Sequence, residues 1–334
     1  MNTKRIISLV ASLALVLSLS VGLTGCGDKA AQDDNQGSTD GEGTKYTVGI
    51  CQLVQHEALD AATQGFIDAL NEALPGQVEF QNKNASGDSA NCSTIVNGFV
   101  SDGVDLIMAN ATPALTAAAA ATSDIPILGT SITAYGVALD IDDFNGTVGG
   151  NISGTSDLAD LEAQANMITE WFPDATKVGL LFCSAEPNSR YQIDEVRKAL
   201  EAQGVTCEEF AFTDSNDVSS VTQKAADFSD VVYLPTDNTA ASNTEAIANV
   251  LIPAGVPAIC GEEGICRGCG VATLSISYYD LGVTTGKMAA KILKGEAGIS
   301  EMPVEYTDAT PKYNASICDQ LGITPLDGYE AIDG

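Results

Sequence analysis

Apolar runs alternate with amphipathic stretches along most of the chain. With Val48, Val78, Val104 and Pro126 as markers of β-rich runs, the steps are 30, 26 and 22 residues, and Val178, Thr206, Val231 and Pro257 give steps of 28, 25 and 26. A stretch with helical spacing separates each run from the next. Strands and helices that alternate at this spacing indicate parallel sheets covered by helices on both faces. The pattern predicts an α/β protein of two similar lobes.

The helical stretches carry one apolar stripe each, as helices that cover a sheet require. One stripe consists of Leu59, Ala62, Phe66, Ala69 and Leu70, and another of Ile193, Val196 and Leu200. Both have the spacing of a single helix face and are predicted to be core. Trp171 and Phe172, at the end of a helix expected to begin near Asp157, are also predicted to be core.

The first 44 residues differ from the rest. Lys4 and Arg5 precede an apolar run that ends near Leu23, and the motif "LTGC" follows, which is the pattern of a secretory signal. A small-residue pair before Cys26 resembles the bacterial lipobox, whose cysteine is acylated; the alternative is an ordinary signal that contains a cysteine. We expect a signal peptide at 1–25 and, because apolar residues are almost absent, a flexible tether at 26–44.

Charge narrows the classes of partner. The formal net charge is −30, from 15 basic and 45 acidic residues. Such an acidic surface argues against nucleic acid and against electrostatic binding to anionic lipid. The body of about 290 residues is large enough for two compact domains.

Nine cysteines are present, and most carry no motif that indicates a function. Cys51, Cys183 and Cys260 lie in or beside strand-like runs, where a thiol packs as a small hydrophobe. Only Cys266 and Cys269, in "CRGC", have a spacing that is typical of a functional pair. We expect this segment to be a loop that carries free thiols or a local disulfide. A metal or redox site is the alternative, although a structural zinc site needs a second such pair or histidines.

Polar residues follow the predicted strands at equivalent points in both halves. In an open parallel sheet, ligands gather beyond the carboxyl ends of the strands, beside helix N-termini that favour anions. The candidates at these points are Gln55, His56, Thr112, Ser131, Thr133, Asp237, Asn238 and Glu262. Thr112 is expected to cap a helix that begins at Pro113. Hydroxyls facing carboxylates suit a zwitterion such as an amino acid, whereas each residue alone could be a cap or turn former.

Four segments carry a resemblance to a known family. The segments "VGICQLVQHEALDAATQGF", "ANATPAL", "YLPTDNTAAS" and "ISYYDLGVTTGKMAAKILKGE" resemble ABC-transporter solute-binding lipoproteins of the group that includes tryptophan- and other aromatic-amino-acid-binding members. The resemblance implies the type I periplasmic-binding-protein fold, with a three-segment hinge. The N-terminal lobe would comprise 45–153 and 278–306, the C-terminal lobe 154–276, and the third crossing with the C-terminal segment 307–334.

The resemblance also implies a ligand site and partners. It adds Asp157 and Asn188 to the pocket. Thr112, Ser131 and Thr133 would hold the ligand carboxylate, and Asp237 with Asn238 would hold the ammonium group. Gln55 and His56 would line the side-chain portion of the pocket or its mouth, and the alternative for His56 is a capping role beside Glu57. The ligand would be an amino acid such as Trp, Phe or Tyr, delivered to a membrane permease by a receptor anchored outside the cytoplasm through lipid on Cys26. No cofactor or metal is expected.

Other functions remain open from the sequence. A nucleoside- or sugar-binding lipoprotein of the same fold, or a ligand-sensing lipoprotein, would have a similar pattern of elements. An enzyme is not expected, because the sequence shows no nucleophile elbow, phosphate-binding glycine loop or metal triad.

Overall fold

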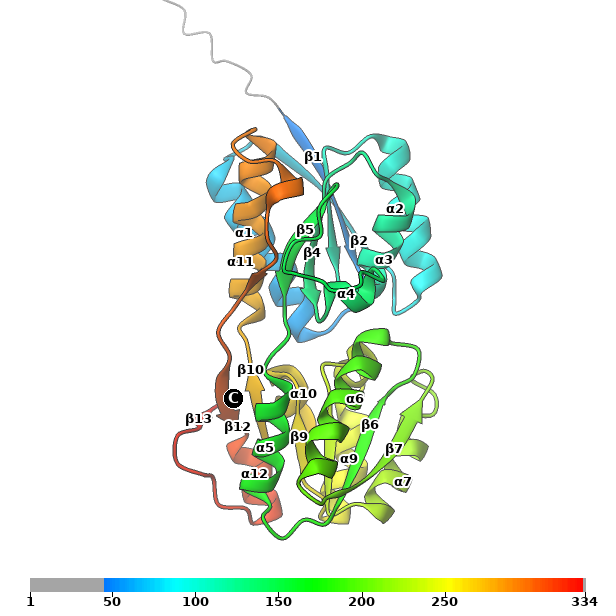
Figure 1. The fold of residues 1–334 in the computed structure, drawn as a ribbon, viewed down its shortest axis with the longest axis vertical. Helices are drawn as coiled ribbons and strands as arrows, with labels where there is room; N and C mark the ends of the chain where they lie inside the picture. The colour runs from blue at the N-terminus through cyan, green and yellow to red at the C-terminus, as the bar shows by residue number, and fades with distance from the viewer. Residues whose placement is uncertain (1–44, 333–334) are drawn as a thin grey trace, which may run out of the picture. The chain divides into compact units, whose positions relative to one another are not determined.

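Two sheets organise residues 45–332, which the computed structural model describes (Figure 1). The predicted signal peptide, Cys26 and the tether lie outside these residues. The first sheet has the strand order β11-β5-β4-β3-β1-β2, and the second has the order β13-β12-β10-β9-β8-β6-β7. The predicted fold class, two α/β lobes built on parallel sheets, is confirmed.

All strand pairs of the first sheet are parallel. Its strands are β1 (Tyr46–Gln52), β2 (Val78–Asn84), β3 (Leu106–Asn110), β4 (Ile127–Ile132), β5 (Ile152–Ser156) and β11 (Glu305–Tyr306). Alternate residues of β1 and β3 face opposite sides and are nearly all buried, as expected of a parallel sheet covered on both faces.

The second sheet is parallel except at one edge. Its strands are β6 (Lys177–Cys183), β7 (Thr206–Phe212), β8 (Val231–Leu234), β9 (Ala258–Cys260), β10 (Ala272–Ser275), β12 (Thr310–Tyr313) and β13 (Glu330–Ala331). β12 pairs with β10 in the antiparallel direction, and β13 is parallel to β12. The sequence analysis did not anticipate this antiparallel edge.

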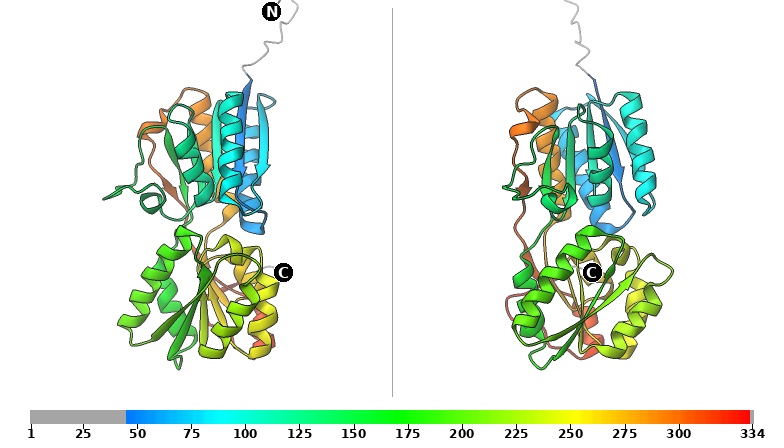
Figure 2. Two further views of the ribbon diagram at one scale, coloured as in Figure 1. Left: turned by 90° about the vertical axis from the view of Figure 1, so that its right-hand side faces the viewer. Right: turned by 45° about the vertical axis from the view of Figure 1, so that its right-hand side comes forward.

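Helices cover both faces of the first sheet (Figure 2). One layer consists of α1 (Glu57–Ala73) and α11 (Tyr278–Leu293), and the other of α2 (Ser89–Asp102), α3 (Thr112–Ala121) and α4 (Tyr135–Ala138). Helices α1 and α11 lie so close together that neither has room for a side chain at two contact points. A Cβ atom at Gly65 would lie 2.1 Å from the Tyr279 carbonyl oxygen, and one at Gly282 would lie 2.0 Å from the Ala62 carbonyl oxygen. Glycine permits this approach, which ties α11 to the first sheet although it follows the second in sequence.

The second sheet is covered in the same way. Helices α5 (Leu161–Trp171), α6 (Pro187–Ala202) and α12 (Ala315–Leu321) share one core, and α7 (Val218–Phe228), α8 (Asn238–Ala241), α9 (Thr244–Ala254) and α10 (Glu263–Cys269) share the other. A short 3-10 helix, η1 (Ile299–Glu301), precedes β11. The predicted apolar stripes and Trp171 are buried, as expected, and Phe172 packs against the same core.

Two details of the predicted elements are wrong. The helix expected to begin near Asp157 begins at Leu161, because the Asp160 side chain accepts a hydrogen bond from the Ala163 amide and caps it. "CRGC" lies in helix α10 rather than in a loop, since Glu262 caps that helix. Both cysteines are buried free thiols, like most of the other cysteines that the structure describes.

Three segments connect the two sheets. The chain passes from β5 in the first sheet to α5 beside the second, returns from β10 to α11, and passes again from β11 to β12. Asp157 and Tyr278 lie on the first two of these segments, so contacts between them join parts of the hinge. The ligand site is therefore expected between the lobes, beside these crossings.

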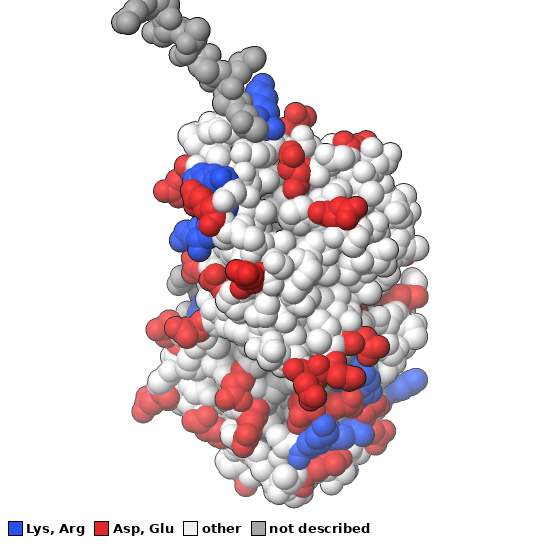
Figure 3. Space-filling model, turned by 45° about the horizontal axis from the view of Figure 1, so that its top comes forward, with Lys and Arg blue, Asp and Glu red and all other residues white. Residues whose placement is uncertain are grey.

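Charge is distributed unevenly over the surface. No lysine, arginine or histidine occurs between Lys83 and Lys177. Figure 3 shows a broad face of the first lobe with few charged side chains, whereas charged residues crowd the second lobe. Within residues 45–332, no helix is both long and apolar enough to cross a membrane.

Candidate functional site

The loops at the carboxyl ends of the strands meet between the lobes. His56, after β1, and Asn238, after β8, are in hydrogen-bond contact, with 3.3 Å between Nε2 and Oδ1. Three cavities of about 240, 230 and 280 Å³ are lined by residues from both lobes. The predicted crevice thus lies between the lobes, and two of its predicted residues form a bridge across it.

The first lobe contributes buried hydroxyl groups. Thr112, Ser131 and Thr133 are buried at the carboxyl ends of β3 and β4. Ser131 adopts φ 56°, an unusual angle for a residue other than glycine, and its buried Oγ has no hydrogen-bond partner among the described residues. A strained backbone that presents a free hydroxyl is typical of a ligand contact.

Thr112 is not the helix cap that the sequence predicted. The cap is Ala111, whose φ of 90° turns the chain while its amide bonds the Thr130 carbonyl oxygen at 3.1 Å. This turn starts the helix one residue earlier, so that Thr112 is its first residue and Pro113 its second. Thr112 remains at the N-terminus of α3, where backbone amides favour an anion.

Asp157 is a buried carboxylate with one oxygen free. The Tyr278 hydroxyl donates to Oδ2 at 2.9 Å, whereas Oδ1 is buried and has no partner among the described residues. Burial raises the pKa of Asp157 to about 6, against the lowering effects of Tyr278 and Thr133. A cationic ligand group would supply the missing partner of Oδ1 and would hold the carboxylate ionised.

Asp237, the predicted ammonium ligand, is occupied by the protein itself. Its Oδ1 accepts from the Ala240 amide at 2.8 Å and caps α8, and its Oδ2 accepts from the Cys183 amide at 2.7 Å. Burial, with the nearby charge of Glu186, raises the pKa of Asp237 to about 7. Both oxygens thus already have backbone donors within the second lobe.

Glu186 is a central residue that the sequence analysis missed. Its carboxylate accepts from the Asn238 amide and side chain, at 3.0 and 2.7 Å, and from the Thr239 amide and hydroxyl, at 2.8 and 2.7 Å. Glu186 is 5 % exposed and precedes Pro187 at the start of α6. The Glu-Pro pair indicated a helix start, but the contact of Glu186 with the start of α8 was not evident from the sequence.

Asn188 lies in the first turn of α6 rather than in a loop. Its side-chain amide donates to the Thr236 carbonyl oxygen at 3.0 Å, and its buried Oδ1 has no partner among the described residues. The bond to Thr236 orients the amide group, so that the carbonyl oxygen is left to accept a further hydrogen bond. Asn188 in the second lobe, like Asp157, therefore has a buried side-chain oxygen that is free to accept a hydrogen bond from a ligand.

The remaining candidates lie near the mouth or in capping positions. Glu262 is buried and accepts from the Gly264 and Ile265 amides, which caps α10, and burial raises its pKa to about 7. Gln55 is exposed and lines the 280 Å³ cavity together with His56 and Glu262. Burial lowers the pKa of His56, opposed by its bond to Asn238, so the neutral ring is favoured at neutral pH.

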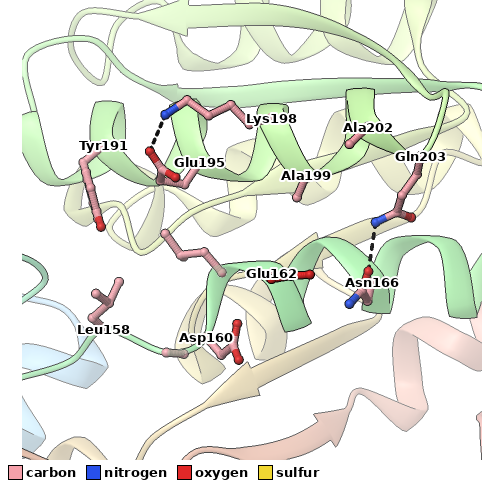
Figure 4. A pocket seen from close by; sticks show the side chains of 12 residues that line it. Leu158, Asp160, Glu162, Asn166, Tyr191, Glu195, Lys198, Ala199, Ala202 and Gln203 are labelled. Carbon is pink, nitrogen blue, oxygen red and sulfur yellow. Dashed lines mark hydrogen bonds and ion pairs between the residues drawn. The ribbon is translucent and has the colours of Figure 1, made fainter.

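A larger groove lies away from the crevice. It measures about 670 Å³ and lies between α5 and α6 of the second lobe, where Lys198 pairs with Glu195 and Gln203 bonds Asn166 (Figure 4). None of the ten predicted ligand residues lines it. Volume alone therefore does not identify the site, and buried polar atoms without a partner are a second, independent guide to it.

No cluster suited to a metal occurs among residues 45–332. No group of three or more His, Cys, Asp or Glu side chains there is arranged to hold an ion. Cys260, Cys266 and Cys269 are close enough to interact through their thiols, and burial raises the pKa of Cys266. These thiols are protonated at neutral pH, which disfavours metal binding and nucleophilic chemistry.

Comparison with known proteins identifies the family. The family model described as "ABC transporter substrate binding protein" matches residues 47–328. A tyrosine-binding protein of Clostridioides difficile (strain R20291) is 33% identical over 321 residues, which are 92% of this chain and 89% of that protein.

Two solved structures show the same fold. The Streptococcus pneumonia ABC domain in complex with L-Trp has a TM-score of 0.82 and 30% identity, over 86% of this chain and all of that one. The ligand-free, open structure of a Clostridium difficile substrate-binding protein with adhesive properties has a TM-score of 0.66 and 32% identity, over 86% of this chain and 99% of that one. At similar identity, the arrangement of this chain is nearer to that of the tryptophan complex. The family predicted from the sequence is thus confirmed, and the chain belongs to the ABC transporter substrate binding proteins.

Proposed function

We propose that this protein binds an aromatic L-amino acid in the crevice between its lobes and delivers it to an ABC permease. A relative that binds tyrosine and a structural neighbour in complex with L-Trp support this ligand class. The family supports a role outside the cytoplasm in transport rather than catalysis.

One observation supports this proposal more than any other: both lobes leave buried polar atoms free at or just beyond the carboxyl ends of their strands. Ser131 Oγ, Asp157 Oδ1 and Asn188 Oδ1 are each on a side chain about 5 % exposed, and none has a partner among the described residues. A buried polar atom left unpaired costs about 1–3 kcal/mol. A ligand with a cationic and an anionic end would satisfy all three.

The free atoms suggest how the ligand is oriented. Asp157 Oδ1 and Asn188 Oδ1 are acceptors and suit the ammonium group, whereas the Ser131 and Thr133 hydroxyls and the backbone amide of Thr112 suit the carboxylate. This assignment moves the ammonium contact from Asp237 to Asp157, because both oxygens of Asp237 already accept backbone hydrogen bonds.

The mouth of the crevice would receive the remainder of the ligand. Gln55 and His56 line the cavity there, with Glu262 behind them and Asn238 held by His56 and Glu186. A neutral imidazole can pack against an aromatic ring of the ligand. Asn238 thus supports the closed mouth rather than the ammonium group.

Ligand retention follows from closure. A ligand that bridges the lobes favours the closed state only by its difference in affinity for closed over open protein. Micromolar affinity corresponds to about −8 kcal/mol, which two charged-group contacts and one buried ring can supply after ordering costs.

The two lobes would comprise 45–153 with 278–306, and 154–276, with 307–334 as the third crossing and C-terminal segment.

Lipid on Cys26 would keep the receptor beside its permease. The "LTGC" motif supports acylation at Cys26, and residues 1–25 would be removed. We expect Cys26→Ala to abolish incorporation of labelled fatty acid and to release the protein from the membrane fraction. Unchanged membrane retention of that variant would refute the lipid anchor without bearing on the ligand.

Titration calorimetry with purified protein tests the ligand class. L-tyrosine, L-tryptophan and L-phenylalanine should release or absorb heat with one site per chain, whereas glucose and a nucleoside should not. A sugar or nucleoside that binds while all three amino acids fail would replace this proposal with the nucleoside- or sugar-binding alternative. Chemical change of a bound amino acid during incubation would indicate an enzyme instead.

A further inference from the structure

A row of alternating charges crosses the crevice beside its mouth. Arg267, on α10 of the second lobe, pairs through one guanidinium nitrogen with Glu57, the first residue of α1 in the first lobe. Its other terminal nitrogen bonds Glu263 at 2.7 Å, and Lys312 on β12 bonds the second oxygen of Glu263 at 2.6 Å. The row joins the first lobe, the second lobe and the third crossing segment.

Cations are scarce at the crevice. Of the residues that line its three cavities, only Arg267 and Lys312 are basic. The whole chain has 15 basic and 45 acidic residues. Two cations at one edge of the crevice therefore need an explanation, and their carboxylate partners, Glu57 and Glu263, supply it.

Of the three ion pairs in this row, only one requires the two lobes to be closed. The pairs of Glu263 with Arg267 and with Lys312 lie within the second lobe and its sheet, so opening of the lobes would not break them. The Glu57 pair joins α1 to α10 and would break. Arg is suited to this task because its planar fork can hold two carboxylates at once, which the single ammonium of Lys does less well.

We propose that Arg267 is a positioning residue that latches the lobes together through Glu57, and so prolongs ligand retention without touching the ligand. Glu263 and Lys312 hold the guanidinium in place before closure, which lowers the entropy that the latch loses on forming. The bond between His56 and Asn238 lies directly beside the latch, because His56 precedes Glu57.

The competing role for Arg267 is contact with the ligand carboxylate. The two roles predict opposite effects of a change at Glu57. If Glu57 forms a latch, its loss weakens ligand binding; if it competes with ligand for Arg267, its loss strengthens binding.

A double-mutant cycle on ligand affinity tests the latch, and its use of an aromatic amino acid rests on the proposed function. With L-tyrosine or L-tryptophan in calorimetry, we expect Glu57→Gln and Arg267→Gln each to raise Kd about threefold, and the double variant to raise it no further than Arg267→Gln alone. Arg267→Lys should recover part of the loss. In 0.5 M NaCl the differences should shrink towards zero.

Arg197→Gln is the matched control. Arg197 has a side-chain exposure of 33 %, against 32 % for Arg267, and pairs with Glu209 within the second lobe. Its loss should leave Kd unchanged. An equal effect of the control, additive effects of Glu57→Gln and Arg267→Gln, or tighter binding after Glu57→Gln would overturn the proposal.

A ligand-free experiment separates this proposal from the proposed function. In the protein with both E57C and R267C, a bis-methanethiosulfonate reagent with a spacer as long as an arginine–glutamate pair should cross-link the lobes, detected by non-reducing peptide mapping, whereas E57C with R197C should not be cross-linked. Absence of the first cross-link would contradict the latch whatever the ligand is. Cross-linking in a protein that binds none of the three amino acids would refute the ligand class alone.

Discussion

The two lobes present different chemistry to the same crevice. The second lobe contributes three buried carboxylates, Glu186, Asp237 and Glu262, and every one of them accepts hydrogen bonds from the start of a helix in that lobe. The first lobe and its crossing contribute hydroxyls and one carboxylate, Asp157, and leave Ser131 Oγ and Asp157 Oδ1 free. A charged group at a crevice is therefore not by itself a ligand contact; the unpaired atom is the better guide.

The largest expected effect is on Asp157. Replacing it with Ala removes the proposed partner of the ammonium group, which should raise Kd for an aromatic amino acid about 100-fold, or about 3 kcal/mol. The melting temperature of ligand-free protein should also fall, by less than in the Asp237 variant, because only the buried Tyr278 hydroxyl loses its acceptor whereas Oδ1 bonds nothing in the described protein. Calorimetry and thermal unfolding of the same samples check both parts. Wild-type affinity in Asp157→Ala would place the ammonium group elsewhere.

Replacing Asp237 is expected to lower the stability of the protein more than its affinity for the ligand. Asp237→Ala leaves the buried Cys183 and Ala240 amides without an acceptor, which should cost about 3 kcal/mol of unfolding free energy and lower the melting temperature by about 8 °C. Asp237→Asn, which keeps one acceptor oxygen, should lose less. If Asp237→Ala instead keeps its melting temperature and loses its ligand, the difference between the two lobes described above does not hold.

A change of pH should act mainly through Asp157. Its raised pKa of about 6 means that the carboxylate becomes neutral as pH falls through 6, and only the ionised form attracts an ammonium group. Affinity should be highest above pH 6 and should fall by up to about tenfold for each pH unit below it. Affinity of Asp157→Asn, measured over the same range, should be weak and much flatter. An equally steep profile in that variant would assign the titration to another group.

A smaller effect is expected at Ser131. Ser131→Ala removes a hydroxyl without a protein partner, so Kd should rise about fivefold and stability should hardly change. Ser131→Gly is the control for the backbone, since glycine adopts φ 56° without strain. Equal affinity of the wild type and Ser131→Ala would remove this hydroxyl from the carboxylate site.

Much of the fold could be predicted from the sequence because its signals are local. The alternation of apolar runs and stripes specifies buried parallel strands and covering helices, and both stripes that it predicted are buried. The antiparallel edge formed by β12 could not be predicted, since β10 and β12 are joined by a long segment that passes through α11 and the first lobe. Pairing between distant segments leaves no periodic signal in either of them.

The site was harder to predict for a related reason. Position at the end of a strand identified eight candidates, and the family resemblance added Asp157 and Asn188. The partners of a carboxylate, however, depend on segments far apart in the chain: Asp237 bonds the Cys183 amide, 54 residues earlier. Glu186 was missed because its role depends on the start of α8, more than 50 residues later. The sequence locates polar residues at an edge of a sheet; only the fold shows which atoms are already paired.

A crystal structure of the protein with bound L-tyrosine or L-tryptophan tests the central claim most directly. The account predicts the ligand ammonium group within hydrogen-bond distance of Asp157 Oδ1, with Asp237 still bonded to the Cys183 and Ala240 amides. An ammonium group on Asp237, with Asp157 Oδ1 left unpaired, would contradict it.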